Sequence, residues 1–194
     1  EFLQRIRTDA TVRRGQWVNL QDMSPALRTA LVLSEDKRFH EHSGVDWRAI
    51  SAAAWGNLWN TRTRGASTIT MQLAALIEDD GGTLQRGAGG RTVPQKLGQA
   101  VAAKRLERQW RKDQILEAYL NLVGFRGEVV GIGALSARLF QKYPSGLNHD
   151  EAAIVAALVR APNAPARRVA DRACALLREQ KLAPDCSALA TYTA

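Results

Sequence analysis

The side chains best suited to acid–base chemistry lie in one short segment. Glu35 and Asp36 are adjacent, and Phe39 and His42 follow at three-residue intervals. A carboxylate at the junction of a helix and a loop, partly shielded by an aromatic ring, can act as a general base or acid. Taken alone, the segment is more typical of a solvated helix end, with Asp46 as the cap of the next helix. Acid–base chemistry therefore needs support from other segments.

A second segment has the residue types of an anion site. Ser67 and Thr68 supply hydroxyls and free amides at the start of a helix, Arg64 stands just ahead, and Gln72 follows. Unpaired N–H groups and the dipole at a helix start both favour negative charge. An ordinary Ser/Thr helix cap explains this stretch equally well when it is considered alone.

Two further segments carry polar side chains at helical spacing. Lys96 and Gln99 are three residues apart, so they share a helical face and can act on one ligand. Glu117, Tyr119 and Asn121 are interpreted as buried polar anchors between helices rather than as catalytic groups.

Helices must position all of these residues, because helical spacing recurs along the chain and strand alternation is nearly absent. The sequence therefore predicts a single all-α domain. Five glycines in the twelve residues 79–90 predict a mobile loop, and 124–133 is expected to be partly extended. Residues 167–182 are predicted to form one exposed basic helix, followed by a weakly ordered end of the chain. The other predicted helices are 25–35, 46–58, 68–77, 93–109, 115–123, 134–142 and 152–159. Ser24 followed by Pro25 predicts the start of the first of these, and Asn148 with Glu151 predicts the cap of the last. Trp47 is assigned to the apolar stripe of the helix 46–58.

Composition narrows the class of protein. The chain has 194 residues, of which 45% are hydrophobic, enough to build a core without staples. Its 27 Lys and Arg against 19 Asp and Glu give a formal charge of +8, which favours an anionic partner: nucleic acid, acidic lipid or a phosphorylated substrate. No membrane-spanning stretch or signal peptide is recognised, and a start at Glu1 suggests an excised domain.

The two cysteines, Cys174 and Cys186, predict no metal site, because they lack a CxxC spacing and the histidines are distant in sequence. A disulfide in an oxidising compartment and two unrelated buried thiols are equally good interpretations.

Three motifs stand in series along the chain. They are Glu35-Asp36-x-x-Phe39-x-x-His42-x-Gly44-x-Asp46, then Gly65-Ala66-Ser67-Thr68-Ile69-Thr70-x-Gln72, then Lys112-x-x-Ile115-Leu116-Glu117-x-Tyr119-Leu120-Asn121. Their order and spacing, from about residue 20 to 165, resemble the peptidoglycan glycosyltransferase domain of class A penicillin-binding proteins, glycosyltransferase family 51.

The resemblance implies a lysozyme-like all-α fold with a small membrane-associated lobe. It implies an enzyme that polymerises lipid II into glycan strands, with inversion at the anomeric carbon and release of undecaprenyl diphosphate. Glu35 matches the general base on the acceptor sugar's 4-hydroxyl, and Asp36, Phe39 and His42 match its supporting residues. Negative charge develops on the leaving diphosphate, so cations and amides are expected around it. The residues expected to bind it are Arg64, Ser67, Thr68, Gln72, Lys96 and, as a departure from the family, Gln99.

The resemblance also implies a location and partners. The catalytic domain is expected on the outer, periplasmic face of a bacterial cytoplasmic (inner) membrane, bound to lipid II and the growing glycan strand. Trp55 and Trp59 form an amphipathic patch suited to the headgroup boundary. No cofactor is required by the sequence and no metal ligands are assigned, although a divalent cation, Mg or Mn, assists the diphosphate in several relatives. Residues 1–166 are expected to form the glycosyltransferase domain and 167–194 a helical linker toward a C-terminal transpeptidase domain.

The chain departs from the common family pattern at several positions. Most members have Arg-Lys-x-x-Glu where this chain has Gln95 and Lys96 followed by Gln99, so a second carboxylate is missing. Met71 precedes Gln72 where Gln-Gln is usual. These departures resemble the penicillin-binding protein 1C branch.

Two other classes of function compete with this interpretation. A lysozyme-like lytic hydrolase would use Glu35 as a general acid, but it has no diphosphate for Arg64 and Lys96 to stabilise. A basic helical nucleic-acid-binding module would need cations on one face with stacking aromatics, whereas the cations here are spread over several helices.

Overall fold

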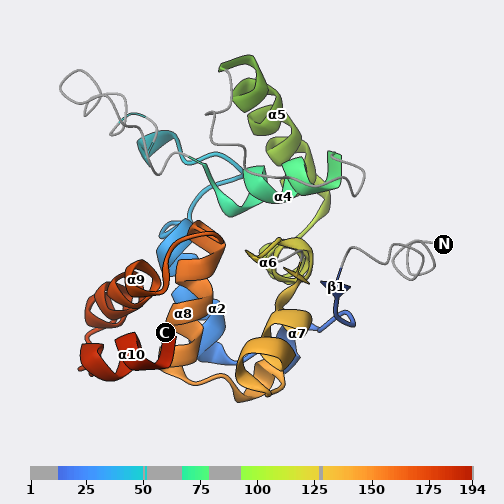
Figure 1. The fold of residues 1–194 in the computed structure, drawn as a ribbon. Coiled ribbons are helices and arrows are strands. Elements are labelled where there is room, and N and C mark those ends of the chain that lie inside the picture. The colour runs from blue at the N-terminus through green and yellow to red at the C-terminus, as the bar shows by residue number, and fades with distance from the viewer. Residues whose placement is uncertain (1–12, 50, 52–66, 79–92, 127–128, 194) are drawn as a thin grey trace. The chain divides into compact units, whose positions relative to one another are not determined.

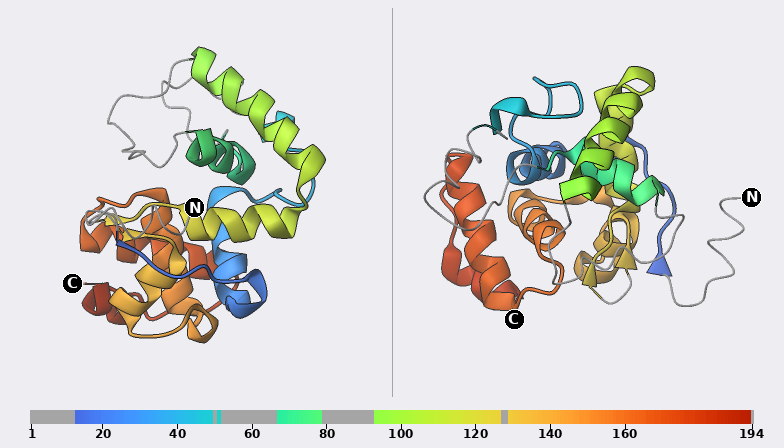
Figure 2. Two further views of the ribbon diagram at one scale, coloured as in Figure 1. Left: turned by 90° about the vertical axis from the view of Figure 1, so that its right-hand side faces the viewer. Right: turned by 90° about the horizontal axis from the view of Figure 1, so that it is seen from above.

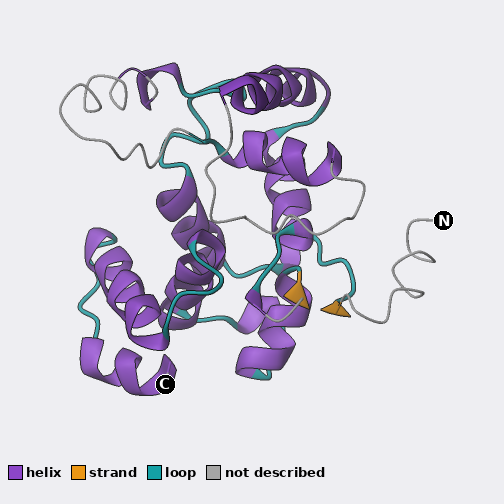
Figure 3. Ribbon diagram, turned by 45° about the horizontal axis from the view of Figure 1, so that its top comes forward, coloured by secondary structure: helices purple, strands orange, loops and turns teal. Residues whose placement is uncertain are grey.

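The computed structural model describes residues 13–49, 51, 67–78, 93–126 and 129–193, with the backbone alone at 13, 14 and 93–96. Almost all regular structure in these ranges is helical, which confirms the predicted all-α class (Figure 3). The chain forms two compact units. The first unit comprises residues 1–34 and 120–194, and the second unit comprises residues 35–119.

The first unit is built around two helices whose starts were visible in the sequence. α2 (Pro25–Glu35) begins after Ser24, whose Oγ accepts the amide of Leu27 at 3.1 Å, and it buries Leu27, Ala30 and Leu31. α8 (His149–Arg160) begins with the predicted capping box between Asn148 and Glu151. α8 is buried from Glu151 to Ala157, and α9 packs against it. Arg160 at its end donates to the Ser34 carbonyl oxygen at 2.8 Å.

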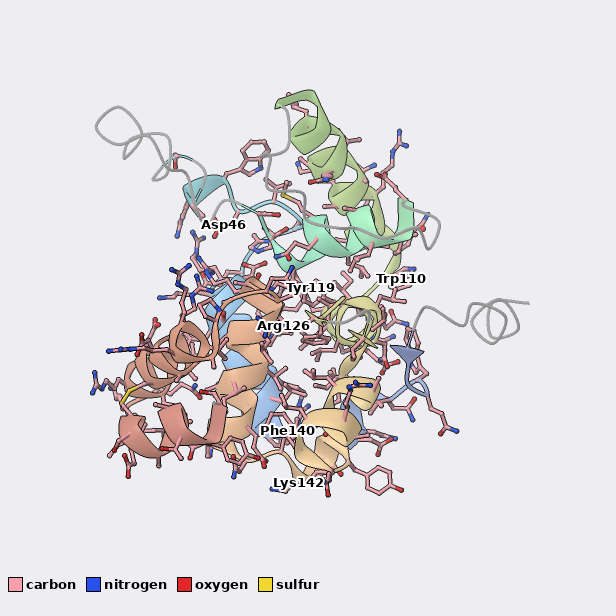
Figure 4. The ribbon with its side chains drawn as sticks, viewed as in Figure 1. Asp46, Trp110, Tyr119, Arg126, Phe140 and Lys142 are labelled. Carbon is pink, nitrogen blue, oxygen red and sulfur yellow. A yellow bond between two sulfur atoms is a disulfide. The ribbon has the colours of Figure 1, made fainter. Side chains whose placement is uncertain are left out.

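The C-terminal part differs from the sequence prediction. The predicted exposed helix is α9 (Ala166–Glu179), which packs against α8 and buries an apolar face on one side (Figure 1). The predicted weakly ordered end is a further helix, α10 (Cys186–Thr193), packed against α9. Asp185 caps α10, and its hydrogen bonds, first from the Ser187 hydroxyl and then from amides, lower the pKa of its carboxyl. A disulfide between Cys174 and Cys186, visible in yellow in Figure 4, joins the two helices.

The remaining part of the first unit contains the only strands among the described residues, consistent with the partly extended prediction for 124–133. β1 (Arg13–Arg14) pairs in parallel with β2 (Val129–Val130). Gly131 then has φ +83°, and an added Cβ would lie 2.5 Å from the Asn121 carbonyl oxygen, so only glycine fits. The predicted helix 134–142 is replaced by α7 (Ile132–Leu135) and a π-helix, Ser136–Phe140. Single turns of 3-10 helix occupy Leu20–Asp22 and Pro144–Gly146.

Within the described residues of the second unit, the longest helical segments belong to α4, α5 and α6. α4 (Ile69–Glu78) packs against α5 (Val93–Gln109), as Figure 2 shows, and all of Ile69 to Ala75 is buried. α6 (Lys112–Leu122) begins one turn earlier than predicted and contributes its part up to Tyr119 to this unit. Asp46 accepts the amides of Arg48 and Ala49, as expected of a helix cap. Most of the helix predicted after it, and the predicted loop 79–90, lie outside the described residues.

Candidate active site

The second unit brings Glu35 into a chain of hydrogen bonds with two other polar residues. Glu35 is the last residue of α2 and is half-buried. The side-chain amide of Gln72, on α4, donates to Glu35 Oε2 at 3.1 Å. The hydroxyl of Tyr119, on α6, donates to Gln72 Oε1 at 2.9 Å. Gln72 is 7% exposed and Tyr119 is fully buried. The carboxylate predicted to be the base is therefore held by a side chain on α4, which in turn accepts a hydrogen bond from a side chain on α6.

Asp36 has a different environment from its neighbour. It is buried, and its oxygens pair with His42 Nε2 at 2.9 and 3.0 Å. Its Oδ2 also accepts the backbone amide of Ile69, at the start of α4, at 3.1 Å. Because α2 ends between the two carboxylates, Glu35 and Asp36 have separate partners. Asp36, which follows the last residue of α2, thus links the loop residue His42 to the beginning of α4.

A second network surrounds Phe39, the fully buried aromatic residue of the first motif. The rings of Phe39 and His42 contact edge to face, with centroids 6.5 Å apart. Lys112 Nζ lies 4.4 Å from the centroid of the Phe39 ring and forms a 2.6 Å ion pair with Glu107. The Thr70 hydroxyl donates to the same Glu107 oxygen at 2.6 Å. The expected support from Phe39 is thus reinforced by contacts that tie α4, α5 and α6 together.

The beginning of α4 differs from the expected anion site. Thr68 is 3% exposed; its hydroxyl donates to the Gly44 carbonyl at 2.6 Å and accepts the Met71 amide at 3.1 Å. The Ile69 amide is taken by Asp36. Thr68 is therefore a helix cap, and the prediction that its segment offers free amides is wrong for Ile69 and Met71. The physical reason is that the Asp36 carboxylate already satisfies the positive end of this helix.

Gly44 is the point at which the loop of the first motif meets α5. Its φ is +84°, and an added Cβ would lie 2.9 Å from the backbone of Ala103. Nearby, Arg38 donates to Asp46 at 3.0 Å and to Glu41 at 2.9 Å. The hydrogen bond to Glu41, aided by the charge of Asp46, raises the pKa of Arg38 above its ordinary value. Glycine in this motif is thus a requirement of backbone shape.

The other residues predicted to bind substrate are described only in part. The Ser67 Oγ is buried and has no hydrogen-bond partner among the described residues. Gln99 is half-buried on α5, and for Lys96 the backbone alone is described. Arg64 and the predicted membrane residues Trp55 and Trp59 lie outside the described residues.

An exposed apolar surface was not recognised from the sequence. Trp47 and Leu97 are each 62% exposed, and Val101 is 51% exposed. Leu97 and Val101 are one turn apart on α5, and Lys104 of the same helix lies 5.9 Å from the Trp47 ring centroid. We call Trp47, Leu97 and Val101 the α5 apolar surface. The four-residue spacing of Leu97 and Val101 could have indicated an apolar face on α5, but Trp47 was assigned to the apolar stripe of the helix predicted at 46–58.

Two searches over the described residues give negative findings. No group of three or more His, Cys, Asp or Glu side chains there is arranged to hold a metal ion. None of the helices in that part of the chain combines the length and the hydropathy needed to cross a bilayer.

Comparison with known proteins adds an independent observation. The family model described as transglycosylase matches residues 2–181. A biosynthetic peptidoglycan transglycosylase of Rhodospirillum centenum is 38% identical over 167 residues, which cover 85% of this chain and 67% of that protein. One from Mannheimia succiniciproducens is 35% identical over 167 residues, 63% of its length. Penicillin-binding protein 1C of Escherichia coli is 38% identical over 162 residues, covering 81% of this chain but 20% of that protein. The chain thus spans about two thirds of the first relatives and a fifth of the last.

Proposed function

The chain belongs to the transglycosylase family, and we propose that, as a peptidoglycan glycosyltransferase, it polymerises lipid II into glycan strands. The match over residues 2–181 confirms the family inferred from the three motifs. The observation that carries the reaction is the Glu35 carboxylate, half-buried and held by the Gln72 amide. A fixed, partly shielded carboxylate is what a general base requires.

The proposed reaction is an inverting transfer. Glu35 accepts the proton of the acceptor sugar's 4-hydroxyl as that oxygen bonds to the anomeric carbon of the growing chain. The bond from this carbon to the diphosphate oxygen breaks, and undecaprenyl diphosphate leaves with the electron pair. Displacement from the opposite face inverts the anomeric centre. Asp36 takes no proton in this scheme, because its oxygens are occupied by His42 and the Ile69 amide.

The leaving diphosphate needs positive charge and hydrogen-bond donors. We assign Arg64 and Lys96 as its cations, with Gln99 as a neutral hydrogen-bonding group one turn beyond Lys96. The buried, unpartnered hydroxyl of Ser67 supports a role for it in the same site. Thr68 and Gln72 are reassigned, since Thr68 caps α4 and Gln72 holds the base.

We further propose that the domain works at the outer, periplasmic face of the cytoplasmic membrane, where lipid II is presented. The α5 apolar surface supports this proposal, because aromatic and aliphatic side chains beside Lys104 suit a headgroup boundary. Trp55 and Trp59 are proposed as further membrane contacts. The chain is not proposed to bind nucleic acid.

The place of the chain within a larger protein is also a proposal. Residues 1–166 would form the catalytic domain, and 167–194 would lead toward a transpeptidase domain. The match to a fifth of penicillin-binding protein 1C supports a longer parent protein. Met71 and Gln99 favour the 1C branch, and the 38% identity to that protein is compatible with it.

The experiment that tests the reaction compares Glu35→Gln with Glu41→Gln. Both substitutions remove one carboxylate, but Glu41 is exposed and pairs with Arg38. With lipid II as substrate we expect Glu35→Gln to lower polymerisation by at least about 100-fold, the usual contribution of a general base, and Glu41→Gln to keep the wild-type rate. Wild-type turnover by Glu35→Gln would remove Glu35 as the base.

A parallel incubation with finished glycan separates transfer from hydrolysis. A lytic enzyme shortens the glycan and leaves lipid II unpolymerised, whereas a transferase lengthens chains and leaves finished glycan intact. Shortening without chain growth would favour the hydrolase alternative.

A further inference from the structure

We propose that Tyr119 is a positioning residue for the base: its hydroxyl fixes the orientation of the Gln72 carboxamide, which in turn holds Glu35. The inference rests on the proposed role of Glu35 and adds a residue that acts through another. From the sequence, Tyr119 was interpreted as a structural anchor, and its ring does lie fully buried in the second unit. Its hydroxyl, however, points to a group that contacts the reacting carboxylate.

The hydrogen-bonding capacities of the three groups allow one arrangement. An ionised carboxylate only accepts hydrogen bonds, so the NH₂ group of Gln72 must face Glu35. The carboxamide oxygen then faces Tyr119, whose hydroxyl must donate. Rotating the carboxamide by half a turn would bring its oxygen against Glu35 Oε2, where the present N···O distance is 3.1 Å. The Gln72 and Glu35 oxygens are both acceptors and would repel each other at that distance. The hydroxyl of Tyr119 would also lose the hydrogen bond that it donates to Gln72.

Burial makes this preference matter. Gln72 is 7% exposed, so water has little access to compensate a misdirected amide. A buried polar group without its partner carries a substantial free-energy cost. The hydrogen bond from Tyr119 therefore adds to the preference, set first by the Glu35 carboxylate, for the amide orientation in which Gln72 donates to Glu35.

The framework around these residues keeps the distances fixed. Lys112 and Tyr119 are seven residues apart on α6 and so lie on the same face two turns apart. Lys112 pairs with Glu107, to which Thr70 of α4 also donates. Thr70 and Gln72 are two residues apart on α4. Residues two apart on a helix point to different faces, so the Glu107 contacts are a second connection between α4 and α6, beside the hydrogen bond from Tyr119 to Gln72.

Tyr119→Phe tests the proposal, since it removes the hydroxyl and keeps the ring that fills the core. With lipid II as substrate we expect kcat to fall about tenfold and KM to stay within a factor of about two, because small errors in the position of a catalytic group slow the chemical step. Tyr143→Phe is the matched control, because Tyr143 is 85% exposed and lies in the first unit. A wild-type kcat for Tyr119→Phe would overturn the proposal.

A double-mutant cycle separates positioning from a general packing role. Gln72→Met keeps a long unbranched side chain and removes the amide. If Tyr119 acts through Gln72, adding Tyr119→Phe to Gln72→Met costs no further activity. If the two losses multiply, Tyr119 acts by another route and the proposal fails.

A measurement without substrate distinguishes failure of this inference from failure of the proposed function. The side-chain amide protons of Gln72, assigned by NMR through loss of their signal in Gln72→Met, should exchange with solvent several-fold faster in Tyr119→Phe than in wild type. Unchanged exchange would overturn the positioning role whatever the enzyme does. A wild-type protein that leaves lipid II unpolymerised would sink the proposed function, and faster exchange in Tyr119→Phe would still establish that Tyr119 orients the amide.

Discussion

Glu35 and Asp36 are adjacent but have different partners, and the contacts of Asp36 allow its contribution to the stability of the protein to be predicted. In Asp36→Ala, the Ile69 amide at the start of α4 loses its cap and His42 Nε2 loses its partner. Loss of a helix cap costs about 1 kcal/mol. A buried polar group left unpaired costs about 2 kcal/mol. The free energy of unfolding should therefore fall by about 3 kcal/mol, which for a chain of this length lowers Tm by roughly 6–12 °C.

Asp36→Asn provides the matched comparison. The asparagine oxygen can still accept the Ile69 amide, and its NH₂ group can donate to His42 Nε2 if the imidazole carries its proton on Nδ1. His42 Nδ1 is buried and has no hydrogen-bond partner among the described residues. Moving the proton to Nδ1 therefore breaks no hydrogen bond of that atom, but it leaves a buried N–H group without an acceptor. We expect a loss of about 1 kcal/mol and a Tm lower by roughly 2–4 °C.

The assay combines thermal unfolding with polymerisation of lipid II. Asp36→Asn should polymerise within a few-fold of wild type, because Asp36 holds structure and takes no part in proton transfer. An Asp36→Ala protein with the wild-type Tm would refute the burial argument. An Asp36→Asn protein as inactive as Glu35→Gln, with the wild-type Tm, would refute the assignment of a purely structural role.

Two further predictions concern the disulfide of the first unit and the α5 apolar surface. The Cys174–Cys186 disulfide closes a loop with a sequence separation of 12, so Cys174→Ser with Cys186→Ser should lower stability by about 3 kcal/mol, as thermal unfolding of oxidised protein will show. Reduction of the disulfide should lower the Tm of the wild-type protein as much as the double substitution does, and it should leave the Tm of the double variant unchanged. A wild-type Tm that does not change on reduction would contradict this prediction. Leu97→Asp with Val101→Asp should reduce sedimentation with phosphatidylglycerol vesicles several-fold, whereas Leu139→Asp, also exposed but in the first unit, should not. Equal binding by all three proteins would exclude the α5 apolar surface as a membrane contact.

Local sequence signals predicted much of the helical framework. Ser24 followed by Pro25 fixed the start of α2, and Asn148 with Glu151 fixed the cap of α8, because each acts on amides within a few residues of itself. The predicted exposure of α9 and weak order of α10 were wrong because they depend on packing between elements and not on local signals. Whether a basic amphipathic helix is exposed depends on a distant partner, and α9 finds its partners in α8 and α10.

In the candidate site too, the sequence did not predict contacts between residues that are far apart in the chain. The sequence identified Glu35, Asp36, Phe39, His42 and Gln72, but it did not assign their partners. The bond from Asp36 to the Ile69 amide spans 33 residues, and the bond from Tyr119 to Gln72 spans 47. No local pattern encodes which amide a carboxylate will meet over such a separation. Roles that depend on a partner, such as that of Gln72, therefore became visible only in the structure.

The position of Asp36 also bears on how the diphosphate would be stabilised. A carboxylate at the start of α4 offsets the helix dipole there, so this terminus supplies little positive potential to a leaving group. The positive charge that stabilises the diphosphate would then come from side chains, for which we propose Arg64 and Lys96. Glutamate at position 99 would share a face of α5 with Lys96 and pair with it at i,i+3, partly cancelling its charge. In the proposed site, Gln99 would remove that competitor and would leave the full charge of Lys96 for the substrate.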